Sequence, residues 1–206
     1  MEAANAALAA YQEEHGQPAF QAAISSGQYK YPDGVFFGGH GPSWSNATLR
    51  SILREYLSDV DGLAVIDFHT GLGPYGVAEL ITAGPPAQKA MAQQWFGAEV
   101  TDPDAGTSAS AALDGVNANG IARTLPDARI GFIAAEFGTR DIDTVLGAVR
   151  ADNWLYNKGD VTSDQGRAIK AKIRDACYPE FDDWKGMIWQ RSRELVDQAM
   201  AGLAGM

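Results

Sequence analysis

The residues in this sequence best suited to do chemistry follow two apolar segments. His69 comes directly after the run 63–68 (Leu-Ala-Val-Ile-Asp-Phe), and Glu136 comes directly after the run 130–135 (Ile-Gly-Phe-Ile-Ala-Ala). A glycine lies two residues beyond each of them, as is common where a strand enters a turn. Ligands of open α/β sheets bind beyond the carboxyl ends of strands, so both side chains are candidates for one site.

Each candidate also has a structural interpretation. His69 could be a hydrogen-bonded core histidine at a strand end, and Glu136 could cap the turn that follows it. Asp67 projects to the same strand face as His69, because side chains alternate along a strand. It could orient the imidazole, as carboxylates do around metal-bound histidines, or it could bond to a loop amide. The residues alone leave these alternatives open.

Strands interleaved with helices must position these residues. The expected strands are 63–68, 77–82, 98–101 and 130–136, and the expected helices are 2–14, 18–26, 45–57 with Ser45 as N-cap, 87–96, 142–156, 164–178 and 181–203. This order predicts an α/β fold with a mixed, mostly parallel sheet flanked by helices. The nearly continuous apolar run 63–68 is typical of a strand that helices cover on both faces.

Composition limits the possible partners. With 206 residues, 46% of them hydrophobic, the chain predicts a single domain over 1–206. Its net charge of −10 argues against nucleic acid and anionic lipid, which need clustered Lys and Arg. No apolar run of about 18 residues and no signal-peptide pattern is found, so we expect no membrane contact and a cytoplasmic location. The single cysteine, Cys177, excludes an internal disulfide and a cysteine-cluster metal site.

A longer set of motifs resembles a known superfamily. These motifs are Gly27-Gln28-Tyr29, Pro32-Asp33-Gly34, Trp44-Ser45-Asn46, Asp67-Phe68-His69-Thr70-Gly71-Leu72-Gly73-Pro74-Tyr75-Gly76, Glu136-Phe137-Gly138-Thr139 and Ala151-Asp152-Asn153-Trp154-Leu155. They are similar to motifs of the zinc carboxypeptidase superfamily, which includes the succinylglutamate desuccinylase and aspartoacylase branch. They resemble more closely a bacterial branch of unassigned function, domain of unknown function 2817.

The resemblance implies a zinc-carboxypeptidase-like (phosphorylase/hydrolase-like) fold with a zinc cofactor. It makes His69 the last of three zinc ligands and Glu136 the general base or acid that works on the metal-bound water. The other two ligands of the family belong to an upstream His-x-x-Glu motif. None of His15, His40 and His69 begins such a motif. We therefore expect the chain to correspond to the C-terminal portion of a carboxypeptidase-like domain, incomplete at its N-terminus.

The resemblance also implies a reaction and a substrate class. It predicts hydrolysis of an amide or peptide bond near a free carboxylate, in a small peptide or an N-acyl amino acid. Arg140 is a candidate for binding that carboxylate, and Tyr75 could reach over the pocket as a hydrogen-bond donor. A surface salt bridge for Arg140 and loop packing for Tyr75 are the alternatives.

Two other functions are compatible with the residues. A noncatalytic or truncated binding module would keep the fold without a complete metal site. A glycosidase would use Asp67 and Glu136 as paired carboxylates without metal, but this leaves His69 without a role. If strands of the same sheet are missing from this chain, its exposed edge could be covered by another copy, so a homo-oligomer is also expected.

Overall fold

The computed structural model describes residues 2–108 and 110–206 as an α/β fold built on a four-stranded sheet. The strands are β1 (Gly62–Tyr75), β2 (Ala78–Ile81), β3 (Val100–Thr101) and β4 (Arg129–Gly138), in the order β1-β4-β2-β3. β1 is parallel to β4, β4 is antiparallel to β2, and β2 is parallel to β3. The predicted α/β class with a mixed, mostly parallel sheet is therefore confirmed.

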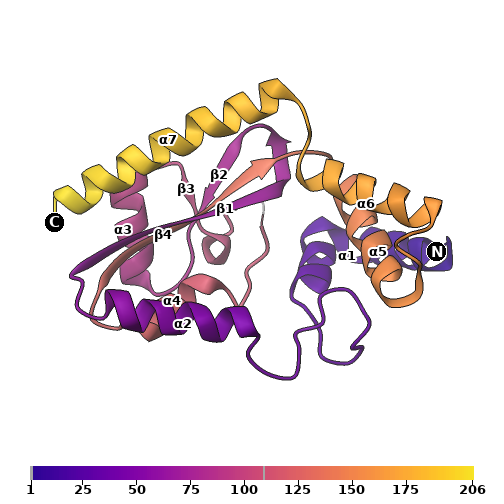
Figure 1. Cartoon of the computed structure of the whole chain (residues 1–206), viewed down its shortest axis with the longest axis horizontal. Helices are drawn as coiled ribbons and strands as arrows, with labels where there is room; N and C mark the ends of the chain where they lie inside the picture. The colour runs from indigo at the N-terminus through magenta and orange to yellow at the C-terminus, as the bar shows by residue number, and fades with distance from the viewer. Residues whose placement is uncertain (1, 109) are drawn as a thin grey trace.

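Helices flank both faces of this sheet. They are α1 (Glu2–Ser25), α2 (Trp44–Leu57), α3 (Pro86–Phe96), α4 (Asn117–Thr124), α5 (Ile142–Lys158), α6 (Asp164–Cys177) and α7 (Asp182–Ala204). α7 lies along one face and α2 with α4 along the other, whereas α1, α5 and α6 gather at the end of the sheet where β4 leads into α5 (Figure 1). Among the described residues, no helix is both long and apolar enough to cross a membrane.

Local residue chemistry explains several helix ends. α1 is interrupted at Gly16, whose φ of 80° is accessible to glycine, so the two predicted N-terminal helices follow each other directly. The N-cap of α2 is Ser43 and not the predicted Ser45. Ser43 is extended, and its hydroxyl accepts a hydrogen bond from the Asn46 amide, which satisfies one of the free N–H groups of the first turn. α4 was not predicted.

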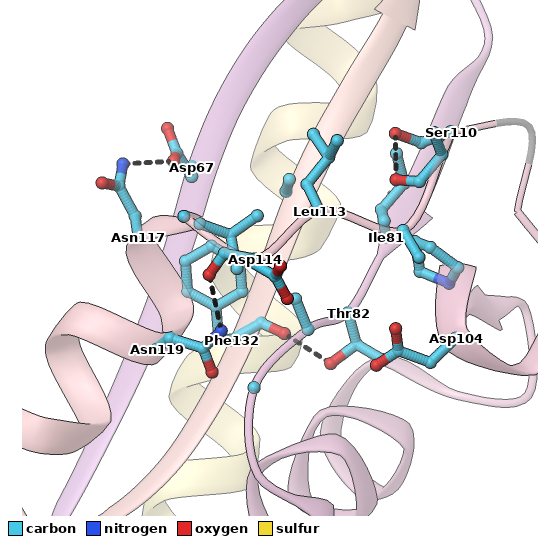
Figure 2. Close-up of a pocket in the computed structure, with 18 of the residues that line it drawn as sticks. Asp67, Ile81, Thr82, Asp104, Ser110, Leu113, Asp114, Asn117, Asn119 and Phe132 are labelled. Carbon is cyan, nitrogen blue, oxygen red and sulfur yellow. Dashed lines mark hydrogen bonds between the residues drawn. The ribbon is translucent and has the colours of Figure 1, made fainter. Parts of the chain in front are cut away.

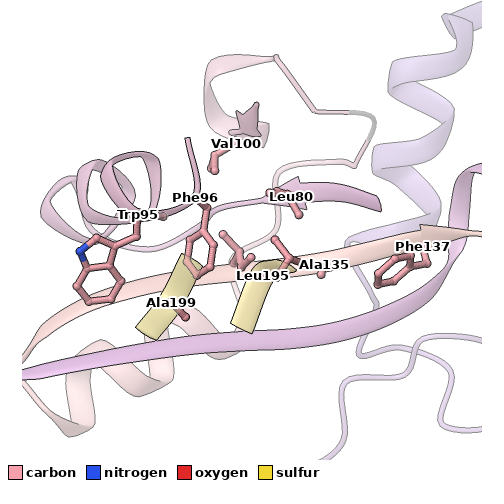
Figure 3. Packing of buried hydrophobic residues seen from close by; sticks show 10 residues of the cluster. Leu80, Trp95, Phe96, Val100, Ala135, Phe137, Leu195 and Ala199 are labelled. Atoms are coloured by element: carbon pink, nitrogen blue, oxygen red, sulfur yellow. The ribbon is translucent and has the colours of Figure 1, made fainter. Parts of the chain in front are cut away.

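The core consists of two apolar clusters, one on each face of the sheet. Ile133 and Ala135 of β4 pack toward α3 and α7, and Figure 3 shows this cluster with Phe96, Leu195 and Ala199. Ile130 and Phe132 pack on the other face, against α2 and α4. Since side chains alternate along a strand, the even-numbered residues of β4, Glu136 included, lie on the α2 and α4 face.

β1 is one of the two edge strands of the sheet, and β3 is the other. Helices lie over both of its faces, as its apolar run predicts: Ala64 and Ile66 pack into the cluster beneath α7, and Leu63 and Val65 pack into the cluster beneath α2. None of its residues from 62 to 70 is buried, however. The apolar run is only partly covered, because an edge strand lacks a neighbour on one side.

Candidate active site

The candidate site lies where β1, β4 and β2 come side by side. His69 of β1 is the register partner of Glu136 of β4, and Glu136 is the register partner of Glu79 of β2. Register partners project to the same face of a sheet, so these three side chains form a row on the α2 and α4 face. Two residues widely separated in sequence, His69 and Glu136, are thus neighbours on adjacent parallel strands. β1 continues to Tyr75, so His69 lies within this strand and not at its end as predicted.

The imidazole of His69 lies between two carboxylates. Its Nε2 is 3.2 Å from Oδ1 of Asp67, and its Nδ1 is 3.6 Å from Oε2 of Glu136. The other oxygen of Asp67 accepts a hydrogen bond of 3.2 Å from the Asn117 side-chain amide, which ties the start of α4 to β1. The imidazole fills the space between Asp67 and Glu136, so this geometry does not favour the paired-carboxylate glycosidase, which needs that space for sugar.

Glu136 is the most enclosed of these groups. Its side chain is 12% exposed, whereas that of His69 is 49% exposed. The backbone N–H of Leu72 donates a hydrogen bond of 3.0 Å to Oε1, which leaves Oε2 toward His69. Burial raises the pKa of Glu136 above its ordinary value, and the Glu79 carboxylate adds to this, although the Leu72 N–H and His69 act in the opposite direction. A carboxyl group with a raised pKa is suited to accept and return a proton near neutral pH.

Glu79 completes the row and is itself held in place. The hydroxyls of Thr101 and Ser108 donate to its Oε1, at 2.8 and 2.6 Å. Its charge therefore lies next to Glu136 at a defined position. Sequence reasoning missed Glu79, although a carboxylate flanked by apolar residues inside an expected strand was the available signal.

A cavity of about 450 Å³ opens beside this row. Figure 2 shows Asn117 pointing toward Asp67 on one side, and Thr82 and Asp104 on the other. Its described lining includes the carboxylates Asp67, Asp104, Asp114 and Glu136 but neither lysine nor arginine. Asp104 is paired with Lys89 at 2.6 Å, and Lys89 also binds Asp102. The cavity beside His69 is thus lined mostly by acidic and neutral groups.

The last turn of α6 holds the two strand ends together. The hydroxyl of Thr139, which is buried, lies 3.0 Å from the carbonyl oxygen of Gly71 and 2.5 Å from that of Ala176, and its single proton is shared between them. Thr70 donates to the carbonyl of Cys177 at 2.5 Å. At Gly138 a Cβ atom would lie 2.1 Å from the Pro74 carbonyl oxygen, so only glycine allows this close approach. The turn glycine after Glu136 therefore has a packing reason.

Tyr75 and Arg140 lie apart from the cavity. Both nitrogens of the Arg140 fork donate to Asp175, at 2.7 and 3.0 Å, and its guanidinium lies over the Phe181 ring. The Tyr75 hydroxyl donates to Asp183 at 3.2 Å. Neither residue lines the cavity beside His69. The structure thus brings together His69, Glu136 and Asp67, and holds the two predicted substrate contacts against α6 and α7.

The metal-donor atoms near His69 form a partial set. Within residues 2–108 and 110–206, no three His, Cys, Asp or Glu side chains are grouped so that they could hold a metal ion. A catalytic zinc typically needs three protein ligands and an open position for water. The described residues of this chain therefore do not fit a catalytic zinc by themselves.

Comparison with known families yields one match. A family model described as a protein of unknown function, DUF2817, matches residues 1–191. No curated protein and no solved structure matches the chain. The match confirms the branch that the sequence motifs indicated, and the link to zinc carboxypeptidases rests on those motifs alone.

Proposed function

This chain belongs to the DUF2817 family of unknown function, and we propose that it is part of a zinc-carboxypeptidase-like hydrolase. In this proposal the chain supplies the residues that transfer protons and one of the zinc ligands. One observation carries this proposal. His69 and Glu136 are register partners on adjacent parallel strands, with Nδ1 and Oε2 3.6 Å apart beside a cavity. A ligand-type imidazole and a carboxyl group with a raised pKa lie where ligands of α/β sheets bind.

In this proposal Glu136 is the general base and acid. It takes a proton from the attacking water and returns it to the leaving amine, so its two protonation states must be close in free energy at working pH. Burial makes them closer by raising the pKa of Glu136. The Leu72 N–H holds Oε1, which leaves Oε2 to exchange the proton.

Asp67 is proposed to orient His69. With its proton on Nε2 facing Asp67, the imidazole presents the lone pair of Nδ1 on the Glu136 side. Asn117 holds the second oxygen of Asp67 and so fixes the orientation of that carboxylate. His69 would then act as one zinc ligand through Nδ1.

Zinc enters the proposal through the family resemblance. Zinc, if bound there with His69 as one ligand, would polarise the scissile carbonyl and lower the pKa of its water to about 7. Since the described residues lack a complete set of ligands, the proposal needs the remaining ones from outside these residues, either from an upstream segment or from another subunit.

The proposed substrate is a small peptide or an N-acyl amino acid with a free carboxylate near the cleaved amide. The acidic lining of the cavity would repel that carboxylate, so it would have to point toward Arg140 and Tyr75. There it would compete with Asp175 for the guanidinium of Arg140.

A second candidate is a noncatalytic binding module. The partial donor set favours it, because one histidine and its neighbouring carboxylates do not form a group that could hold a metal ion. This candidate predicts binding of the same carboxylate-bearing molecules without turnover and without dependence on zinc.

Zinc content and amide hydrolysis test the proposal. We would measure zinc per chain after dialysis against trace metal, and hydrolysis of a panel of N-acyl amino acids and short peptides. His69→Ala should lose zinc, whereas His40→Ala, a histidine that does not line the cavity, should keep it. Glu136→Gln should retain zinc but lower kcat/KM by about 10²–10⁴-fold, the usual contribution of general acid–base catalysis. Glu99→Gln, outside the cavity and paired with Arg191, is the matched control.

The outcomes separate the two candidates. Zinc and turnover that both depend on His69 support the hydrolase. Binding of an N-acyl amino acid by calorimetry, with neither zinc nor turnover, supports the binding module and contradicts catalysis by this chain alone.

A further inference from the structure

On one side of the molecule the sheet, α7 and α2 each present a surface that no other described element covers. In the sheet this is the outer edge of β1, which pairs with β4 and with no other strand of the described residues. Residues 62–69 extend roughly 26 Å, at about 3.3 Å per residue. They contain no lysine, arginine or proline, the residues with which proteins commonly protect an exposed edge.

The α7 layer presents an apolar row on the same side. Trp189 and Val196 are 67% and 47% exposed and are seven residues apart, as is Leu203 from Val196. Leu203 lies beside the start of β1, because a Cβ atom at Gly62 would be 3.4 Å from its Cδ2. Arg191, on the other flank of α7, reaches Glu99 near the end of α3. The row therefore faces away from α3 and toward the open edge of β1.

The α2 layer presents a similar row on the opposite face. Ile52 and Tyr56 lie one turn apart and are 47% and 69% exposed. Arg50, on the other flank, lines the crevice between α2 and α4, and Leu53 is buried in the cluster with α4. Hence the exposed row of α2 also faces away from its neighbouring helix.

We propose that a second copy of this chain docks along this side, with β1 of each copy pairing antiparallel across a two-fold axis perpendicular to the sheet. That axis keeps equivalent faces together, so α7 meets α7 on one face and α2 meets α2 on the other. Each apolar row then covers its own counterpart, and the two four-stranded sheets become one continuous sheet. The surface is self-complementary in all three layers, which favours a second copy over an unrelated partner.

The size of the surface suits a stable dimer. A standard interface buries about 800 Å² per partner. A large aromatic side chain supplies on the order of 150–250 Å² when wholly buried, and Trp189 and Tyr56 are each about two-thirds exposed. The exposed apolar rows of α7 and α2, together with the backbone edge of β1 between them, provide an area on the order of 800 Å² per copy.

Charge opposes this association and provides a signature for it. Each copy carries a net charge of −10, so two copies repel one another at long range. Salt screens that repulsion, with a Debye length of about 10 Å at 0.1 M, while it leaves apolar contacts in place. The dimer should therefore tighten as salt concentration rises.

Sedimentation equilibrium of the purified chain tests the proposal. The native chain should form a dimer at about 50 µM, a concentration well above a low-micromolar Kd. Tyr56→Lys and Trp189→Lys should each raise the dimer Kd at least tenfold, because each substitution removes an aromatic side chain from the interface in both copies of the dimer. Tyr156→Lys makes the same chemical change at an exposed tyrosine of α5 and should leave the Kd unchanged. Far-UV circular dichroism checks that the variants are folded.

Hydrogen exchange identifies the surface in the dimer. Amides within 62–69 should exchange more slowly at high than at low protein concentration, because antiparallel pairing hydrogen-bonds the outward N–H groups. A chain that stays monomeric at about 50 µM and raised salt would overturn the proposal. So would a dimer whose Kd and β1 exchange ignore both lysine substitutions, since another surface would then make the contact.

Discussion

β1 and β4 are adjacent strands with similar apolar sequences but very different burial. Of the ten residues of β4, all but Arg129, Ala134 and Glu136 are buried, whereas no residue of β1 before Gly71 is buried. β4 has strands on both sides, and β1 has one on a single side. The comparison teaches that position in the sheet decides what an apolar strand contributes: β4 builds the core, and β1 combines half of a core strand with an open edge.

The difference extends to the two candidate catalytic residues. Glu136 on the central strand is enclosed and has a raised pKa, which suits proton transfer. His69 on the edge strand is half exposed, with its ring accessible from solvent. An exposed imidazole on an edge strand is accessible to groups from outside the described residues.

The largest expected effect comes from matched isoleucines on the two strands. Ile133→Ala on β4 should lower the free energy of unfolding by about 4 kcal/mol, because Ile133 is fully buried and its loss leaves a cavity. Ile66→Ala on β1 should cost about 2 kcal/mol, since Ile66 is only partly covered. Urea denaturation at low protein concentration measures both. Equal losses would contradict the view that the edge strand contributes less to the core.

A smaller effect is expected from the two threonines that bind the end of α6. Thr139→Val should cost about 2 kcal/mol, because two carbonyls share the single proton of this buried hydroxyl and would lose it. Thr70→Val should cost about 0.5 kcal/mol, because water can reach the Cys177 carbonyl at this exposed site. Thermal unfolding of both variants ranks them. A larger loss at Thr70 would mean that the edge strand is better covered than the structure shows.

The smallest effect is a pH-dependent gain in stability. The folded chain holds a proton on Glu136 more tightly than the unfolded chain does, so stability falls as pH rises through the window above the unfolded pKa of about 4.3. Glu136→Gln cannot ionise and should have a higher Tm than the native chain at pH 7–8. The gap should shrink toward pH 4, where the native carboxyl is protonated in both states. Glu99→Gln, at an exposed carboxylate, is the control and should show no such gain.

Much of the fold was accessible to sequence reasoning because the signals were local. The apolar runs located β4 and the start of β1, and apolar periodicity located α5, α6 and α7 within a few residues. The glycine turn expected after residue 68 is wrong, because β1 continues through Gly71 and Gly73 to Tyr75. α4 escaped notice because its N-cap, Val116, makes no side-chain cap bond and the helix contains Gly120. Asn117 was therefore not recognised as a partner of Asp67.

The candidate site was only partly accessible for a related reason. Alternation along the strand predicted that Asp67 and His69 share a face, and their contact at 3.2 Å agrees with this. Glu79 joins the row through antiparallel pairing of β2 with β4, which no local pattern encodes. Arg140 follows Glu136 closely in sequence, yet the chain turns it toward Asp175 and away from the cavity.

By itself the sequence determined the order of the strands and of every helix except α4, the positions of His69 and Glu136 on two apolar strands, and the family of the chain. These are properties of residue type and spacing over short stretches. Only the tertiary structure decided which strands are neighbours, that Glu79 lies beside Glu136, and that β1 is an edge. Strand pairing joins segments tens of residues apart, and its outcome depends on how the whole chain packs.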